Sequence, residues 1–169
     1  REGVAPLVKL VCAHRIPLAA DAFWSMLHED PYESRWAEAI GLRAYRELER
    51  HENPSEIYRR IQVEVALPNA LLSLIRRAGA SGPPSYVEEQ WRSRNERVVR
   101  WRITPNTFAD RARASGIVRV EPRGPASCER FLDGSIEVGV PLVGTLIERM
   151  AVAMVVDSYE KGAKLAGRI

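Results

Sequence analysis

The residues most able to do chemistry are scattered along this chain rather than grouped in a catalytic motif. The three histidines, His14, His28 and His51, fall in three different predicted elements. Neither Cys12 nor Cys128 belongs to a Cys-x-x-Cys pair or to a Cys/His spacing that holds a metal. The sequence contains no Gly-x-Ser-x-Gly or His-Glu-x-x-His pattern. Motifs therefore predict no catalytic residue, no metal ligand and no cofactor.

Acid–base chemistry would need strand residues that converge inside the fold. Glu64, Glu88, Glu89 and Tyr45 are the candidates, each on a predicted strand. Because successive side chains on a strand point to opposite faces, at most one of Glu88 and Glu89 points inward. The usual place for a strand glutamate is the solvated face, so these residues indicate an enzyme only weakly.

Arg59 is a candidate for binding a charged ligand group. On a strand it shares one face with Ile61 and Val63, which places a guanidinium among apolar side chains. Such an arginine can bind a phosphate or a carboxylate through two hydrogen bonds. The alternative, which is the more common outcome, is a buried ion pair with Glu89 or an exposed strand end.

Arginine accounts for most of the positive charge. The chain has 25 basic residues, of which only Lys9, Lys161 and Lys164 are lysines, and its net charge is +3. The best candidate for nucleic-acid binding is a basic run with two interleaved tryptophans, namely Arg92, Arg94, Arg97, Arg100 and Arg102 with Trp91 and Trp101. Glutamate and glutamine alternate with these arginines, which favours a cross-strand charge ladder on an outer sheet face. We expect no nucleic-acid partner.

The elements that must position these residues form one domain over residues 1–169, whose 46% hydrophobic content is enough for a core. Alternating patterns and turn signals predict a strand, two short helices, six strands in three hairpins and a long helix. The predicted strands span residues 7–17, 42–52, 56–67, 85–93, 97–104, 114–122 and 127–140, and the short helices span 20–27 and 32–40. We therefore expect an α+β fold in which a curved antiparallel sheet of about seven strands grips the C-terminal helix.

The junction between the last strand and the last helix is the most informative stretch. Pro141 is predicted to begin the helix, and Gly144 leaves its first turn unhindered. One helical stripe alternates bulky and small side chains: Val143, Ile147, Ala151, Met154, Ser158, Gly162 and Leu165. Small residues allow either close packing or an unfilled cavity under the helix, and we favour the cavity. Glu148, by contrast, is expected to lie away from this stripe.

The segment between Pro68 and Pro84 is too long for a tight turn. It contains a short amphipathic stretch made of Leu71, Leu72, Leu74, Ile75, Arg76 and Arg77. This stretch is either a lid that touches a membrane or a helical turn that covers the sheet edge. A second loop, with Phe108 at its tip, could serve the same entrance.

No uninterrupted apolar run is long enough to span a membrane, and no signal peptide is recognisable. The chain begins at Arg1 rather than at a methionine, which indicates a piece of a longer protein. The expected location is the cytoplasm or the surface of a membrane, with the amphipathic stretch as the point of peripheral contact.

The order of these elements, together with residues 136–144 (IEVGVPLVG) and the following Ile147 and Glu148, resembles a bacterial branch of the START-like superfamily. This superfamily, also called SRPBCC, has a helix-grip fold. The resemblance implies a cavity between sheet and helix, because members bind sterols, phospholipids, ceramides, plant hormones or polyketides there. A minority are cyclases or hydrolases.

The function we predict is binding, and transfer or sensing, of a hydrophobic small molecule, most simply a lipid. The residues expected to contact it, besides Arg59, are Val63, Trp91, Trp101, Ile103, Met150 and Met154. Methionines at helical spacing are more often plain core, but their flexible thioether chains also suit ligands of varied shape. The alternatives are a cyclase or hydrolase that uses the same cavity, and an interaction domain with a filled interior.

Overall fold

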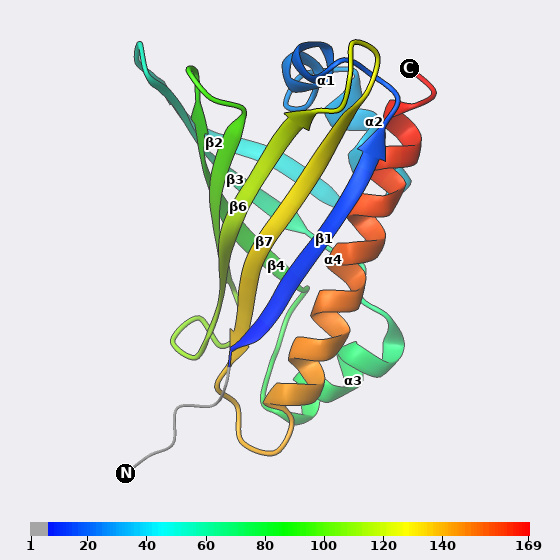
Figure 1. Cartoon of the computed structure of the whole chain (residues 1–169). Coiled ribbons are helices and arrows are strands. Elements are labelled where there is room, and N and C mark those ends of the chain that lie inside the picture. Colours follow the sequence, from blue (N-terminus) through cyan, green and yellow to red (C-terminus); the bar gives the residue numbers. More distant parts are fainter. Residues whose placement is uncertain (1–6) are drawn as a thin grey trace.

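The computed structural model describes residues 7–169 and confirms the predicted order of elements, with one helix added in the segment after Pro68 (Figure 1). The strands are β1 (Val8–Ile16), β2 (Ala44–Glu52), β3 (Glu56–Glu64), β4 (Ser85–Ser93), β5 (Val98–Pro105), β6 (Ala112–Pro122) and β7 (Cys128–Val138). The helices are α1 (Ala20–Met26), α2 (Tyr32–Ala39), α3 (Asn69–Arg77) and α4 (Gly144–Ala166).

All seven strands form one antiparallel sheet in the order β1-β7-β6-β5-β4-β3-β2. The three predicted hairpins are therefore confirmed, and β1 joins the far edge of the last one. Burial alternates along β6, where every second residue is buried or half-buried, so one face of the sheet is covered and the other faces water. In Figure 1, α4 runs diagonally along the covered face beside β1 and β7.

The helix α4 begins later than predicted. Residues 141–143 form a turn in which Leu142 has a φ of 70° and is fully exposed, and the helix starts at Gly144. The reason is a direct contact with the end of β7. The Glu148 side chain is buried and its Oε1 accepts a hydrogen bond of 2.8 Å from the Val138 backbone N–H. Glu148 thus faces the sheet, contrary to the helical-wheel expectation.

Gly144 makes this contact possible. A Cβ atom at position 144 would lie 2.1 Å from the carbonyl oxygen of Val138. We expect Gly144→Ala to lower the free energy of unfolding by about 1–3 kcal/mol, because the first turn of α4 must move away from β7 and stretch the Glu148 bond. Urea unfolding measures this change. The control is Thr145→Ala at the exposed neighbouring position, whose free energy of unfolding should stay within about 0.5 kcal/mol of the wild-type value. A Gly144→Ala variant as stable as this control would contradict the steric argument.

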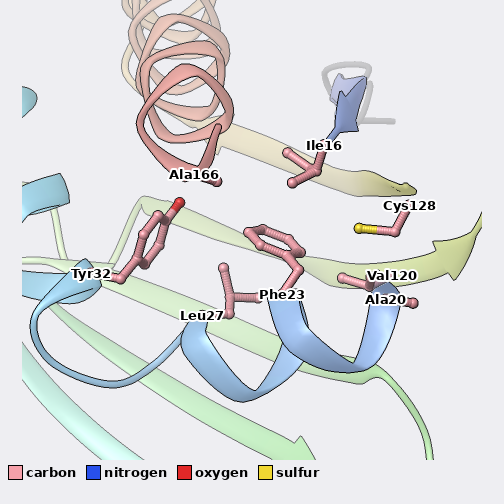
Figure 2. Packing of buried hydrophobic residues seen from close by; sticks show 8 residues of the cluster. All are labelled: Ile16, Ala20, Phe23, Leu27, Tyr32, Val120, Cys128 and Ala166. Atoms are coloured by element: carbon pink, nitrogen blue, oxygen red, sulfur yellow. The ribbon is translucent and has the colours of Figure 1, made fainter. Parts of the chain in front are cut away.

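At the opposite end of α4, the helices α1 and α2 cover the sheet. Figure 2 shows the apolar cluster that joins them, formed by Ile16, Ala20, Phe23, Leu27, Tyr32, Val120, Cys128 and Ala166. The Tyr32 hydroxyl donates a 3.0 Å hydrogen bond to the Gly162 carbonyl oxygen. A Cβ at Gly162 would approach the Trp36 ring to 3.2 Å, so the small residue permits close helix packing here.

The segment after Pro68 folds as the nine-residue helix α3, which lies beside the first turns of α4 (Figure 1). Leu71 and Ile75 are buried against Ile147 of α4. Arg76 and Arg77 are exposed. Within residues 7–169, no helix is both long enough and apolar enough to span a bilayer.

Candidate ligand-binding cavity

A cavity of about 610 Å³ lies between the covered face of the sheet and α4. Both the sheet and α4 contribute to its apolar walls. The strands contribute Leu10, Val99, Trp101, Ile103, Ala114, Val118 and Ile136, and α4 contributes Ile147, Ala151, Met154 and Val155. The alternation of β5 places Val99, Trp101 and Ile103 on this face together.

The small residues on α4 serve two purposes. Ala151 and Ser158 line the cavity. The space beside Gly162, in contrast, is occupied by the side chains of Trp36 and Tyr32. Trp36 also donates a long hydrogen bond of 3.4 Å from its Nε1 to the Ser158 carbonyl oxygen. The cavity therefore extends along α4 from Ile147 to Tyr159 and does not reach Gly162.

Trp101 forms part of the floor of the cavity. A Cβ at Gly116 would lie 2.7 Å from the Cζ2 atom of Trp101, and a Cβ at Gly134 would lie 2.9 Å from the same atom. The indole therefore fits against β6 and β7 only because both positions lack a side chain. Trp101 is 7% exposed, and its Nε1 is buried without a hydrogen-bond partner in the described chain. An indole N–H is a donor only, so it offers one hydrogen bond to a ligand acceptor.

Polar groups gather at β4. Glu88 lines the cavity and accepts a 2.7 Å hydrogen bond from the Gln90 side chain. Burial raises the pKa of Glu88, which the hydrogen bond from Gln90 only partly opposes. Burial, reinforced by the Glu88 charge, raises the pKa of Tyr86, and burial also raises that of Tyr159. The cavity wall therefore holds a carboxyl group with a raised pKa that lies close enough to the phenols of Tyr86 and Tyr159 to affect their pKa values.

A buried ion-pair cluster lies next to these groups. The Arg59 guanidinium is 5% exposed and binds both oxygens of Glu33 at 2.9 and 3.1 Å, and its Nε binds Glu47 at 2.5 Å. Glu33 also accepts a hydrogen bond of 2.5 Å from the Tyr45 hydroxyl. This cluster ties α2 to β2 and β3, and Glu33 and Tyr45 present one side of it to the cavity.

Two further polar side chains line the end of the cavity near α1 and α2, namely His28 and Arg130. Burial, together with the charges of Arg92, Arg59, Arg130 and Arg50, lowers the pKa of His28 to about 3. Its Nε2 is buried and lacks a hydrogen-bond partner among the described residues. His28 is consequently a neutral imidazole at physiological pH, with an unused ring nitrogen.

Of the seven residues predicted to contact a ligand, Trp101, Ile103 and Met154 line the cavity. Val63 is fully buried behind the lining, and Met150 packs against the cluster at α3. Arg59 is held in an ion pair, as the alternative interpretation expected, but its partners are Glu33 and Glu47 rather than Glu89.

Trp91 lies on the other face of the sheet. Its ring contacts Tyr58 at a centroid distance of 5.5 Å, and the guanidinium groups of Arg100 and Arg102 lie over it at 5.7 and 5.5 Å. Three arginines of the basic run form the predicted charge ladder, with salt bridges Arg94–Glu52, Arg100–Glu56 and Arg102–Glu89, whereas Arg97 pairs with Asp21 of α1. Arg92 departs from the prediction, because it points inward and donates to the Trp24 carbonyl oxygen at 2.6 Å.

Some of the predicted lid residues line the cavity and others do not. Leu71, Ile75 and Phe108 line the cavity at its α3 end. Leu72 and Leu74 are half-buried against the same cluster, and Arg76 and Arg77 are exposed. The amphipathic stretch therefore covers an open end of the cavity with its apolar side.

Strand alternation allowed at most one of Glu88 and Glu89 to point inward, without saying which, and the structure places Glu88 in the cavity wall while Glu89 pairs with Arg102. Sequence reasoning missed Tyr86, Tyr159, His28 and Arg130. The sequence did contain a signal for Arg130. It lies two residues from both Cys128 and Leu132 on β7, so all three side chains point to the same, buried face of that strand.

This architecture, one antiparallel sheet that grips a long C-terminal helix over a cavity, is the helix-grip fold of START-like (SRPBCC) proteins. Residues 12–168 match the family described as "Protein of unknown function (DUF2505)", and the chain belongs to that family. No curated protein matches the sequence significantly.

Solved structures share the fold at low sequence identity. The Zhui aromatase/cyclase from Streptomyces sp. R1128 has a TM-score of 0.66 and 14% identity, over 95% of this chain and 92% of that one. A START superfamily protein from Mycobacterium smegmatis has a TM-score of 0.63 and 14% identity, over 95% and 96%. Norcoclaurine synthase from Thalictrum flavum, solved with dopamine and hydroxybenzaldehyde, has a TM-score of 0.58 and 14% identity, over 94% and 87%. These similarities establish the fold alone.

Proposed function

We propose that this protein binds a hydrophobic small molecule, most simply a lipid, in the cavity between the sheet and α4, and carries or senses it. The observation that supports this proposal is the volume of about 610 Å³ enclosed by mostly apolar side chains. It falls inside the range of roughly 300–1,000 Å³ that is usual for small-molecule sites. Removal of apolar ligand surface from water supplies the affinity, at about 25 cal/mol per Å².

The helix α3 acts as the lid in this proposal. Leu71 and Ile75 close the cavity from within, and Arg76 and Arg77 face outward. Exposed arginines on an amphipathic helix suit contact with anionic lipid headgroups. Release of a ligand would then accompany an outward movement of α3 at a membrane surface.

The direct test is native mass spectrometry of the purified protein, followed by solvent extraction and identification of what is released. We expect a hydrophobic molecule in stoichiometric amount, retained through purification. Protein that stays empty, even after incubation with mixed lipids, would argue against a carrier and favour an interaction domain.

Filling the cavity should weaken binding. Ala151→Trp places an indole in the space that faces Trp101 and Met154, so we expect the affinity for the neutral fluorophore N-phenyl-1-naphthylamine to fall at least tenfold, or about 1.4 kcal/mol. Fluorescence titration measures the change. The matched control is Ala153→Trp on the exposed side of the same helix, which should leave the affinity unchanged. Equal loss in both variants, or in neither, would contradict this site.

One observation favours an enzyme as the second candidate. Glu88 is a buried carboxyl group with a raised pKa, inside the cavity and near the hydroxyls of Tyr86 and Tyr159, which suits a general acid for a cyclase or hydrolase. The two candidates separate on the fate of the ligand. A carrier returns the extracted molecule unchanged, whereas an enzyme converts it, and Glu88→Gln stops that conversion without releasing the ligand.

A further inference from the structure

Arg130 is a buried cation in the wall of the cavity. It lies on β7 between the buried residues Cys128 and Leu132, is 4% exposed and lines the cavity near α1 and α2. The burial of a charge is costly unless an opposite charge or several hydrogen bonds compensate it. The partners of this guanidinium therefore decide what it does.

The partners of Arg130 are weak for a buried charge. One terminal nitrogen donates to the Tyr159 carbonyl oxygen at 2.5 Å, and the guanidinium lies over the rings of Tyr159 and Phe23 at 4.5 and 5.9 Å. It is also close enough to the Tyr32 hydroxyl to lower the pKa of that group, which burial otherwise raises. Its Nε has no hydrogen-bond partner, and no carboxylate within residues 7–169 forms a salt bridge with it.

Arg59 shows what a fully compensated arginine looks like in the same molecule. It is equally buried, yet two carboxylates neutralise it and accept three of its hydrogen bonds. Both arginines have the same planar fork of five donors. The difference indicates that the fork of Arg130 retains capacity for an acceptor that is not part of the chain.

The other charged groups that line the cavity are already engaged. Three carboxylates form salt bridges and a fourth accepts a hydrogen bond, in the pairs Glu33–Arg59, Glu137–Arg113, Asp157–Lys161 and Glu88–Gln90. The second arginine of the lining, Arg113, is one of those partners. His28 at the same end is neutral, because burial and the surrounding arginines lower its pKa. Among the described residues that line the cavity, Arg130 is thus the one arginine without a carboxylate partner.

We propose that the ligand carries an anionic group, a carboxylate or a phosphate, that pairs with Arg130, while its apolar part lies against Trp101 and Met154. This inference rests on the proposed function, because it names the ligand class of the same cavity. A planar guanidinium binds either anion through two parallel hydrogen bonds, and burial strengthens the pair.

The position of Arg130 also sets the direction of the ligand. The guanidinium lies beside Tyr159, whereas the lid contacts Ile147, twelve residues earlier on α4. At 1.5 Å per residue these positions are roughly 18 Å apart. The anionic group is therefore held at the closed end under α1 and α2, and the apolar tail points toward α3.

The experiment compares ligands that differ in charge but share one chain. Bound N-phenyl-1-naphthylamine is displaced by dodecanoate, by dodecyl phosphate or by methyl dodecanoate, in the wild type, in Arg130→Gln and in Arg119→Gln. Arg119 is a matched control, because it is an exposed arginine on the outer face that also lies over an aromatic ring, that of Phe131. The carboxylate and phosphate arms distinguish the two sources of the anion.

In the wild type we expect at least one of the two anions to bind tenfold or more tightly than the methyl ester. Arg130→Gln should remove that preference and leave the affinity for the ester within twofold, and Arg119→Gln should change neither. If Arg130→Gln does not fold, the wild type and Arg130→Lys still test the inference. Equal affinities of the wild type for anion and ester overturn it. A tenfold preference for the anion that is retained in Arg130→Lys supports it. A protein that binds the fluorophore but shows no preference refutes the inference alone, whereas one that binds none of these compounds refutes the proposed function as well.

Discussion

Replacement of Arg59 by leucine is expected to lower the free energy of unfolding by about 3–5 kcal/mol, because it leaves the largely buried Glu33 carboxylate without its partner charge and also unpairs Glu47, whose side chain is 34% exposed. The guanidinium binds Glu33 of α2 and Glu47 of β2 from its place on β3. Although burial by itself lowers the pKa of Arg59, its hydrogen bonds to Glu33 raise it by more, so the guanidinium stays charged. Without the arginine, Glu33 keeps only the hydrogen bond from Tyr45.

Urea unfolding followed by circular dichroism measures this loss. The control is Arg100→Leu, which breaks the exposed pair with Glu56, where the arginine side chain is 60% exposed; that change should cost less than about 1 kcal/mol. Further replacement of Glu33 and Glu47 by glutamine in the Arg59→Leu background should restore part of the stability, since the unpaired charges are then gone.

The Arg59→Leu variant also tests whether Arg59 binds a ligand or only forms a structural ion pair. If the residue serves the fold, the folded fraction of Arg59→Leu still binds N-phenyl-1-naphthylamine and dodecanoate with the affinities of the wild type. A variant that keeps its stability but loses only the anionic ligand would restore the interpretation of Arg59 as the ligand-binding arginine and would remove that role from Arg130.

The comparison of Trp91 and Trp101 shows how far sequence alone reaches. The pattern predicts the hairpin that holds both residues, and the structure confirms it. The register pairs Trp101 with Gln90, which places Trp101 inside and Trp91 outside. A shift of one residue would exchange the two faces, and local sequence does not fix that choice where both faces carry bulky side chains.

Long-range contacts set the other limits. The partner of Arg59 could not be inferred from β3, because Glu33 comes from a helix 26 residues earlier. The start of α4 depends on how closely Gly144 approaches Val138, which no helix signal encodes. Similarly, the stripe of small residues on α4 predicts either packing or a cavity, and only the position of Trp36 shows that Gly162 is packed against α2 while Ala151 lines the cavity. Local order is thus readable from sequence, and the choice between filled and empty space is not.

Acid is expected to destabilise this protein through His28 in particular. The pKa of His28 is about 3 in the folded protein, because of burial first and then the charges of Arg92, Arg59 and Arg130, against an ordinary value of 6.5. As the pH falls below 6.5 the unfolded chain binds a proton that the folded protein refuses. The stability contributed by neutral His28 is therefore complete above pH 6.5 and is lost as the pH falls toward 3.

The expected size of this effect is large enough to isolate. At pH 5 the wild type should have lost about 2 kcal/mol through His28, at about 1.4 kcal/mol for each pH unit below 6.5. Urea unfolding at pH 7.5 and pH 5 gives the total loss of stability. His14, whose pKa is also lowered by folding, adds to this loss. Glu88, whose pKa is raised by folding, reduces it. The comparison with His28→Gln removes these shared contributions.

We expect the difference between pH 7.5 and pH 5 to shrink by about 2 kcal/mol in His28→Gln, because glutamine does not titrate in this range. The control is His51→Gln on the exposed end of β2, where the side chain is 68% exposed, and it should keep the pH dependence of the wild type. An unchanged pH dependence in His28→Gln would mean that the imidazole accepts a proton in the folded state. Its unpartnered nitrogen would then offer a second cation beside Arg130, and anionic ligands would bind more tightly in acid than at neutral pH.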